Sequence, residues 1–430
     1  MKAFYHLLAN SLLANIATGY VWFALTYWAY IETKSVLATS IIGGVYLIIT
    51  AVSGIWFGSI VDNNKKKTAI QISTIWIIIF YLLGLGLYQF TPETAFQTVA
   101  SLEFWLLVVL LLGGSIIVNI RNIAIPTVTT ILVEEDKRDK ANGLSGAVFG
   151  LSFAVGSVIS GVLLGFAGMF WVLVSAIGIL ALALLHLSFV SVPEKSIVHL
   201  EDKPKKIDLK GTFKVVKSIH GLLALIFFSA FNNFLGGVFM ALLDAYGLSL
   251  VSVQEWGLLW GVLSFGFIIG GAIIAKRGIG KNPVVTIFQV NIIMWIICIF
   301  FTIQPSIWLL AAGMMIYMIL IPFVEAAEQT VIQKVVPVER QGRVFGFSQS
   351  VEQAASPLTA FLIGPIAQFF FIPFMTTGVG VELIGSWFGT GIGRGLALVF
   401  IATGFIGLVV TLLCMRLPAY KLLQNRYHRQ

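Results

Sequence analysis

The stretch GSIVDNNKKKTA, residues 58–69, decides the fold, because it interrupts apolar sequence with one aspartate and three lysines in quick succession. About twenty apolar residues, the length of one bilayer crossing, precede it, and another apolar run follows. A chain that leaves a bilayer places its polar residues where the membrane meets water. We therefore interpret the stretch as a short loop between two membrane-spanning segments.

The composition supports a lipid environment for most of the chain. Of the 430 residues, 58% are hydrophobic and 11% are charged, and the mean hydropathy is +0.96. Soluble domains carry about 25% charged residues. A soluble fold of this size has no interior large enough to bury so much apolar surface.

The sequence also excludes several kinds of site. The two cysteines, Cys298 and Cys414, predict neither a disulfide framework nor a metal cluster, and the five histidines form no ligand pair at helical spacing. No segment matches the phosphate-binding pattern G-x-x-x-x-G-K-[ST]. Nucleic-acid binding would need basic residues gathered with aromatics on a soluble face, and no such face is visible. We expect no cofactor, no metal and no nucleic-acid partner.

Twelve stretches are long and apolar enough to cross a bilayer. They are expected to be helices, because every backbone N–H and C=O in hydrocarbon must be hydrogen-bonded internally. The first stretch lacks a small-residue cleavage site, so we interpret it as a retained helix rather than a signal peptide. The predicted spans are 5–30, 36–61, 68–90, 104–132, 144–165, 168–192, 218–246, 254–275, 284–303, 306–333, 345–371 and 392–416.

Basic residues in the loops predict the orientation. With the N-terminus inside, cytoplasmic segments hold 24 of the 27 lysines and arginines. The other three are Lys34 and Arg394 in outer segments and Arg121 within a span. We therefore expect both termini in the cytoplasm, and the net charge of +8 follows from this topology.

The chain divides at a polar segment into two halves of six spans each. The halves are residues 1–192 and 218–430, and residues 193–217 link them. The linker carries seven lysines against four acidic residues, which suits a segment lying on anionic lipid and equally a solvated tether. Twelve helices in two pseudo-symmetric six-helix halves resemble the plan of the major facilitator transporters. We predict an all-α membrane protein of that fold.

The opening stretch resembles the loop between helices 2 and 3 of the major facilitator superfamily. The matching residues are Gly58, Asp62, Lys66 and Lys67. An aspartate here can accept hydrogen bonds from the free N–H groups at another helix's N-terminus. The resemblance implies a gating role, in which the loop holds the two halves together on the cytoplasmic side. The alternative is an ordinary positively charged cytoplasmic loop.

A second segment narrows the resemblance to one group of the superfamily. Residues 328–357, EQTVIQKVVPVERQGRVFGFSQSVEQAASP, resemble the helix 10–11 region of bacterial macrolide and enterobactin exporters. Residues 127–143 are similar to the same group, with Ala141 and Asn142 opening helix 5. The resemblance implies a multi-pass efflux protein of the bacterial cell membrane and adds Arg343 to the gating residues. The matching residues are Gln329, Thr330, Gln333, Pro337, Glu339, Gly342, Arg343, Val344, Phe345, Ser350 and Pro357.

Polar side chains within the spans are the candidates for proton and substrate binding. An ionisable group at bilayer depth costs at least ~2.5–3.5 kcal/mol on insertion scales, so each such residue is a functional candidate. Arg121 in helix 4 and Glu325 in helix 10 lie at similar depth in helices that the repeat relates. The full candidate set is Arg121, Asn119, Asn122, Asn232, Asn233, Asp244, Glu325, Glu328 and Glu352.

Each candidate has a structural alternative. Arg121 and Glu325 can be a static pair that braces the halves. Glu328 and Glu352 can pair with Arg343 or Lys334, and Asp244 can simply be solvated near the outer surface. The two asparagines of helix 7 can bond neighbouring helices.

Two classes of function fit the sequence. The first is a secondary transporter, expected to be a monomer, that exports amphipathic molecules in exchange for protons. Uptake of a nutrient and movement of a lysophospholipid are alternatives within this class. The second is a non-transporting sensor or an enzyme on the same fold. An enzyme would need a nucleophile, a base and an orienting group that converge, and no such set is visible. We therefore predict a transporter and not an enzyme.

Overall fold

The computed structural model describes residues 2–194 and 209–429. Contacts between residues divide the chain into two compact units. The first contains residues 1–141, 148–213 and 336–350, and the second contains residues 142–147, 214–335 and 351–430. Within the predicted linker, residues 195–208 lie outside the described residues, and Leu209–Ser218 forms a short helix, α7.

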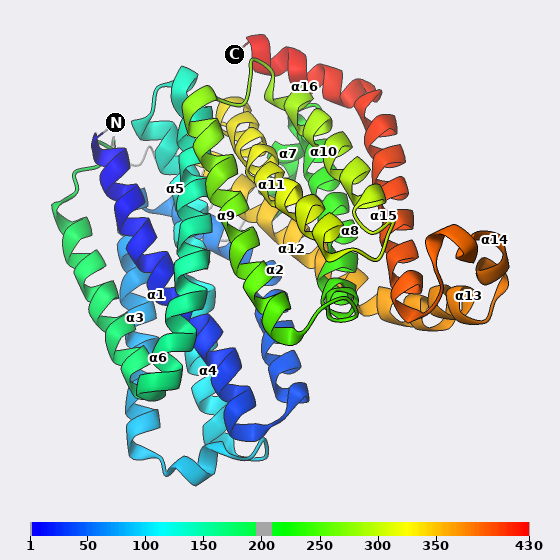
Figure 1. The fold of residues 1–430 in the computed structure, drawn as a ribbon. Coiled ribbons are helices and arrows are strands. Elements are labelled where there is room, and N and C mark those ends of the chain that lie inside the picture. Colours follow the sequence, from blue (N-terminus) through cyan, green and yellow to red (C-terminus); the bar gives the residue numbers. More distant parts are fainter. Residues whose placement is uncertain (1, 195–208, 430) are drawn as a thin grey trace. The chain divides into compact units, whose positions relative to one another are not determined.

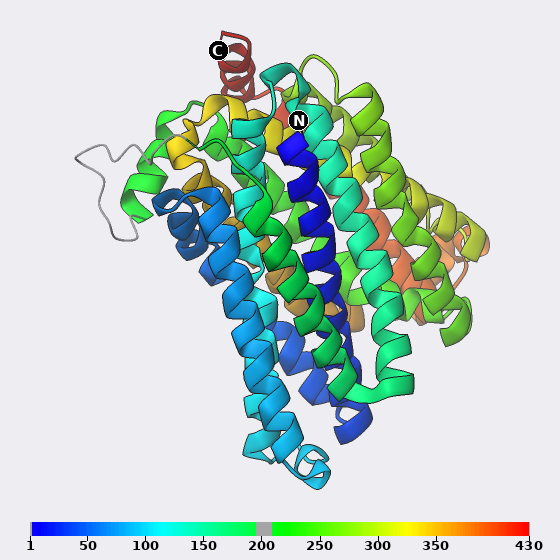
Figure 2. The ribbon, with the colours of Figure 1, turned by 90° about the vertical axis from the view of Figure 1, so that its left-hand side faces the viewer.

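The first half of the chain forms long helices joined by short turns. Its elements are α1 (Lys2–Thr33), α2 (Val36–Asn63), α3 (Lys66–Phe90), the 3-10 turn η1 (Glu93–Phe96), α4 (Leu102–Ile117), α5 (Asn119–Leu132), the 3-10 turn η2 (Glu135–Lys137) and α6 (Arg138–Phe189). Figure 2 shows α3 and α4 packed side by side and joined by the turn that contains η1. The core of this unit combines aliphatic with aromatic side chains, and the rings of Trp28 and Phe104 stack 5.7 Å apart.

Helix α6 contains two of the predicted spans. It has 52 residues, and at 1.5 Å per residue a straight helix would be about 78 Å long, more than twice the thickness of a bilayer core. The chain instead reverses at Gly168, which has φ 75° and ψ 174° (Figure 1). Glycine adopts this positive φ readily because it has no Cβ. The described residues contain eleven helical stretches able to cross a membrane, and with α6 counted as two spans the twelve crossings are as predicted.

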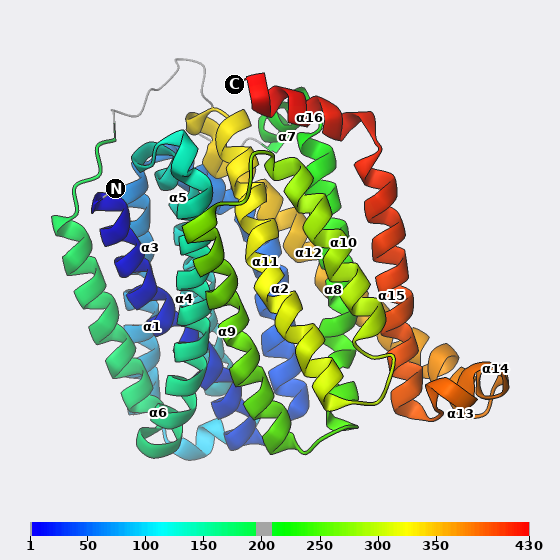
Figure 3. The same ribbon diagram turned by 45° about the horizontal axis from the view of Figure 1, so that its top comes forward.

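The second half contains α8 (Leu222–Leu248), α9 (Val253–Arg277), α10 (Pro283–Phe300), α11 (Ile307–Val335), the 3-10 turn η3 (Val338–Arg340), α12 (Gln341–Ile366), the π-helical turn η4 (Ala367–Phe371), α13 (Ile372–Thr376), α14 (Val379–Phe388), α15 (Ile392–Met415) and α16 (Pro418–Arg429). In the second unit, α10 packs against α11 and α15, and α9 packs against α11. Figure 3 shows α13 and α14 at one end of α15 and α16 at its other end.

Arg394 at the start of α15 anchors the α13–α14 segment. The guanidinium donates to the backbone carbonyls of Phe388, Thr302 and Ile303 at 2.5, 3.0 and 2.7 Å. It also lies 3.7 Å from the centre of the Phe388 ring. Its side chain is buried, and it gives a charged donor to carbonyls at the end of α14 and just after α10.

Candidate functional site

Asp62, at the end of α2, binds the N-terminus of α12. Its Oδ1 accepts the backbone N–H of Gly342 at 2.8 Å, and its Oδ2 accepts that of Arg343 at 3.0 Å. The side chain of Arg343 adds an ion pair, with Nε 3.7 Å from Oδ2, and a hydrogen bond of 3.3 Å to Oδ1 of Asn63. Asp62 is only 4% exposed. A buried carboxylate thus satisfies N–H groups that have no partner within α12 and lies at the positive end of the helix dipole.

Glycines allow α2 and the first turns of α12 to approach closely. A methyl group on Gly54 would come within 2.8 Å of the Gly346 carbonyl oxygen, and one on Gly58 would overlap the Gly342 carbonyl oxygen. The contact is completed by Ser350, whose hydroxyl accepts the N–H of Ile55 at 3.1 Å. Larger residues at these glycines would separate the helices and withdraw Asp62 from its donors.

The lysines of the loop have structural partners. Lys66 is buried, and its Nζ donates to the carbonyls of Val61 and Asn64 at 2.9 and 3.3 Å. The backbone N–H groups of Lys66 and Lys67 donate at 2.6 and 3.0 Å to the two carboxylate oxygens of Glu194. Sequence reasoning missed Glu194, which was counted only among the acidic residues of the linker. The signal for it was a carboxylate five residues after the end of α6.

Arg121, in α5, is at the centre of a polar network inside the first unit. Its terminal nitrogens donate to Asn10 at 2.7 Å, to Ser11 at 3.4 Å and to Thr74 at 2.9 Å. The residue is 1% exposed, and its Nε has no hydrogen-bond partner within the described chain. These three partners are neutral. The polar residues inside α1 and α3 were visible in the sequence, but the sequence did not show that they face Arg121.

The asparagines beside Arg121 form a separate group. Oδ1 of Asn119 accepts from Gln349 of α12 at 2.9 Å and from Asn122 at 3.4 Å. Asn119 also donates to the carbonyl of Ile116 at 3.0 Å. These bonds hold the start of α5 against the first turns of α12 within the first unit.

The glutamates of α11 have different surroundings in the second unit. Glu328 is 9% exposed and accepts a hydrogen bond of 2.6 Å from the hydroxyl of Ser229, whereas the Glu325 side chain is exposed. Glu352 in α12 is half-buried. The predicted pairing of Arg121 with Glu325 would join the two units, and it stays a prediction.

The two asparagines of α8 have different hydrogen-bond partners. Asn232 accepts the indole N–H of Trp295 at 3.0 Å. The backbone carbonyl of Asn233 accepts from the Ser356 hydroxyl at 2.8 Å. The exposed Asn233 side chain donates to the Ser229 carbonyl of its own helix at 3.3 Å, so only Asn232 bonds a neighbouring helix through its side chain.

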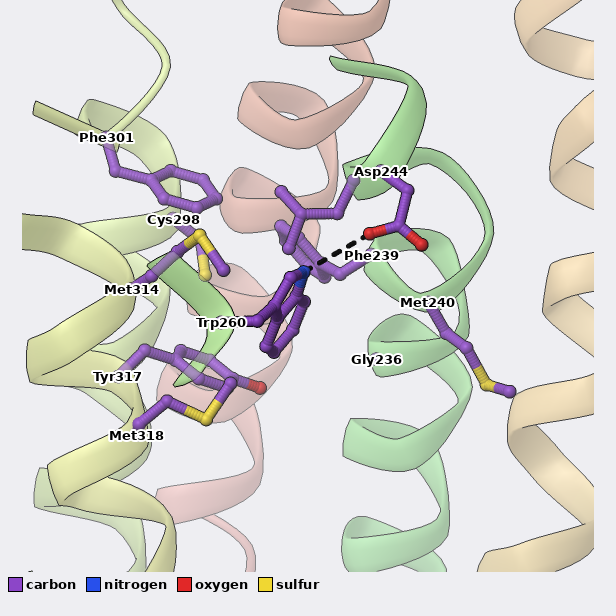
Figure 4. A pocket seen from close by; sticks show the side chains of 11 residues that line it. Gly236, Phe239, Met240, Asp244, Trp260, Cys298, Phe301, Met314, Tyr317 and Met318 are labelled. Carbon is purple, nitrogen blue, oxygen red and sulfur yellow. Dashed lines mark hydrogen bonds between the residues drawn. The ribbon is translucent and has the colours of Figure 1, made fainter. Parts of the chain in front are cut away.

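Asp244, nearer the end of α8, borders a cavity of about 370 Å³ within the second unit. Its Oδ1 accepts the indole N–H groups of Trp256 and Trp260 at 2.9 and 3.3 Å. Figure 4 shows the Trp260 ring between the carboxylate and the opposite wall. The lining residues are otherwise apolar, aromatic or sulfur-containing: Gly236, Phe239, Met240, Leu243, Trp260, Cys298, Phe301, Met314, Tyr317 and Met318. The spacing of the two tryptophans, one helical turn apart on α9, was the signal that sequence reasoning did not use.

Comparison with known proteins identifies the fold and the family. A family model described as the Major Facilitator Superfamily matches residues 7–360. The chain belongs to the Major Facilitator Superfamily. Members of this superfamily are transporters that bind small-molecule substrates. This membership, together with the membrane-spanning helices, makes the chain a multi-pass membrane transporter rather than an enzyme. No protein of curated function matches the sequence.

Solved structures similar to this superfamily member are transporters with low sequence identity. The human organic anion transporter MFSD10 is 13% identical, with a TM-score of 0.69 over 98% of each chain. A bacterial homologue of the iron transporter ferroportin, in an outward-facing state, is 15% identical, with a TM-score of 0.69 over 96% of this chain and 100% of its own. A proton:xylose symporter is 13% identical, with a TM-score of 0.64 over 95% of each chain. At these identities the similarity shows the fold alone.

Proposed function

We propose that this superfamily member is a secondary active transporter that exports amphipathic small molecules by alternating access, in exchange for protons. The observation that carries the proposal is the cavity of the second unit, about 370 Å³ in volume, with apolar and aromatic walls and one carboxylate. Ligand pockets typically measure about 300–1,000 Å³ and are lined by apolar side chains with a few polar groups that fix orientation. Such a lining favours molecules that are largely apolar and carry one polar end.

The contact of Asp62 with α12 supports alternating access. It consists of backbone hydrogen bonds and glycine packing, so it can form and break without a change in secondary structure. The similarity of residues 328–357 to macrolide and enterobactin exporters favours export over uptake. With the basic residues of the loops facing the cytoplasm, both termini would lie inside the cell. The protein would act as a monomer in a bacterial cell membrane.

Proton coupling is proposed for Glu325 together with Arg121. Arg121 is buried with neutral partners in its own unit, and a buried cation without a counter-charge is unfavourable. Glu325 is the carboxylate at comparable depth in the repeat-related helix. Protonation of Glu325 would release Arg121, and loss of the proton would restore their attraction.

Flux into vesicles tests the proposal. Purified protein is reconstituted, a pH gradient is imposed, and uptake of a macrolide, a siderophore and a hydrophobic cation is followed. Glu325→Gln imitates the protonated form, so it should abolish pH-driven flux while substrate still binds. Glu328→Gln is the matched control, because glutamine still accepts the Ser229 hydroxyl, and it should matter less. Accumulation at the wild-type rate in Glu325→Gln would exclude Glu325 as the coupling residue.

A further inference from the structure

The cavity of the second unit is lined by one carboxylate, Asp244, which accepts hydrogen bonds from the neutral indoles of Trp256 and Trp260. We infer that this cavity binds the charged group of a bulky, weakly hydrated organic cation, with the Asp244 carboxylate as its counter-charge. The inference rests on the proposed export function and narrows the substrate to cationic amphipaths. It is supported by the carboxylate's partners, by the ring faces of the walls and by the absence of a suitable environment for other ions.

The side chain of Asp244 is exposed, and its hydrogen-bond partners in the protein carry no charge. The indole N–H groups of Trp256 and Trp260 both donate to its Oδ1. Among the described residues of this unit, no Lys, Arg or His nitrogen forms an ion pair with Asp244, and no hydrogen bond to Oδ2 is found. The buried cation of the same unit, Arg394, donates instead to backbone carbonyls and, at 3.5 Å, to the Tyr246 hydroxyl. One carboxylate oxygen is therefore available to a ligand.

The walls around this carboxylate suit a cation of low hydration. Phe239 lies with its ring centre 5.9 Å from that of Phe301 and 6.5 Å from that of Tyr317, and Trp260 lines the same cavity. Aromatic faces attract cations, most strongly in the case of tryptophan, and the attraction grows when the cation is desolvated. Methionine side chains adapt to ligands of different shape, so the lining can accept more than one cation.

Other ligands fit this cavity less well. An anion about 4 Å from the carboxylate would be repelled by ~4 kcal/mol at an effective dielectric constant of about 20. A hard metal ion needs several oxygen ligands, and the cavity offers a single carboxylate. A soft metal ion needs converging sulfurs, but Figure 4 shows the sulfur of Met240 pointing away from those of Cys298 and Met314. In the part of the chain that the structure describes, no cluster of three His, Cys, Asp or Glu residues is present.

Two probes of almost equal size and opposite charge test the inference. Tetraphenylphosphonium and tetraphenylborate are titrated onto the full-length protein in lipid nanodiscs, and empty nanodiscs give the lipid-bound fraction. The wild-type protein should bind the cation at least tenfold more tightly than the anion. Asp244→Asn should weaken cation binding at least tenfold and leave anion binding unchanged or stronger. Glu382→Gln, which removes an exposed carboxylate of α14, is the control and should change neither.

A pair of substitutions at Trp260 tests the ring independently of the charge. Trp260→Phe keeps an aromatic face and should retain most of the cation affinity, whereas Trp260→Leu should lose it. Equal affinity of the wild-type protein for the two probes, or wild-type cation affinity in Asp244→Asn, would overturn the inference. The comparison of cation and anion affinity on the wild-type protein tests the inference even when a variant does not fold. Two results separate this inference from the proposed function. If vesicles transport amphipathic compounds but cation binding does not depend on Asp244, only this inference fails. If no amphipathic compound is transported, the proposed function fails.

Discussion

Replacing Asp62 by asparagine removes the charge that holds α12 against α2. The carboxylate accepts the N–H groups of Gly342 and Arg343 at 2.8 and 3.0 Å. Asparagine keeps one acceptor oxygen and turns an NH₂ donor toward the second N–H. Loss of one bond to a charged acceptor removes ~1.5–3 kcal/mol, and loss of charge at the helix N-terminus removes ~0.3–1 kcal/mol. The sum, about 2–4 kcal/mol, is a roughly 30- to 1,000-fold shift toward separated helices.

Hydrogen–deuterium exchange measures this shift at the bonded groups. The N–H groups of Gly342 and Arg343 belong to the first turn of α12, where no partner exists within the helix, so their protection depends on Asp62. Exchange in the peptide that begins α12 should accelerate by roughly 30- to 1,000-fold in Asp62→Asn. Transport should be impaired while the protein remains folded and inserted. Asp136→Asn, which changes an exposed carboxylate in η2, is the control. Equal exchange in Asp62→Asn and the wild-type protein would refute the reasoning.

Two further predictions concern packing. Gly58→Ala should separate α2 from α12 and weaken their contact by ~1–3 kcal/mol, because the added methyl group overlaps a carbonyl oxygen. The control is Gly19→Ala, whose added methyl group has no neighbouring atom within 4 Å, so the melting temperature should stay unchanged or rise. Arg394→Gln should lower the melting temperature, since at least two buried carbonyls lose a charged donor at ~1.5–3 kcal/mol each. Limited proteolysis should then cut first between α13 and α15, and a wild-type cleavage pattern would contradict the proposed anchoring role of Arg394.

The membrane spans could be predicted because each depends on local composition. A run of apolar residues must form a helix in lipid whatever its partners are. The short helices α13 and α14 were not predicted, since with 5 and 10 residues they are shorter than a crossing. Their anchor, Arg394, was expected only as a basic residue of an outer segment, and its burial depends on carbonyls that are 91 and 92 residues away.

The candidate site could be predicted only where the chemistry is local. The aspartate at the end of α2 indicated a contact with the N-terminus of another helix, without showing which helix. The docking of Glu194 on the start of α3 joins residues 127 and 128 positions apart, and no spacing rule predicts such a contact. The cavity beside Asp244 draws residues from four helices, and a single sequence does not show which of their faces meet.

Each unit contains a close helix contact at glycines, with different polar chemistry beside it. In the second unit, Gly271 of α9 packs against the start of α6, where an added methyl group would lie 2.6 Å from the Gly143 carbonyl oxygen. The polar bond beside this crossing is neutral, because Asn142 exchanges amide hydrogen bonds of 2.8 and 3.1 Å with Gln333. Hydrogen bonds between neutral groups contribute ~0.5–1.5 kcal/mol, against ~1.5–3 kcal/mol for bonds to a charged acceptor such as Asp62. The crossing of the first unit therefore depends on a charge and the crossing of the second does not. For this reason, loss of Asp62 should disturb the protein more than loss of the Asn142 amide.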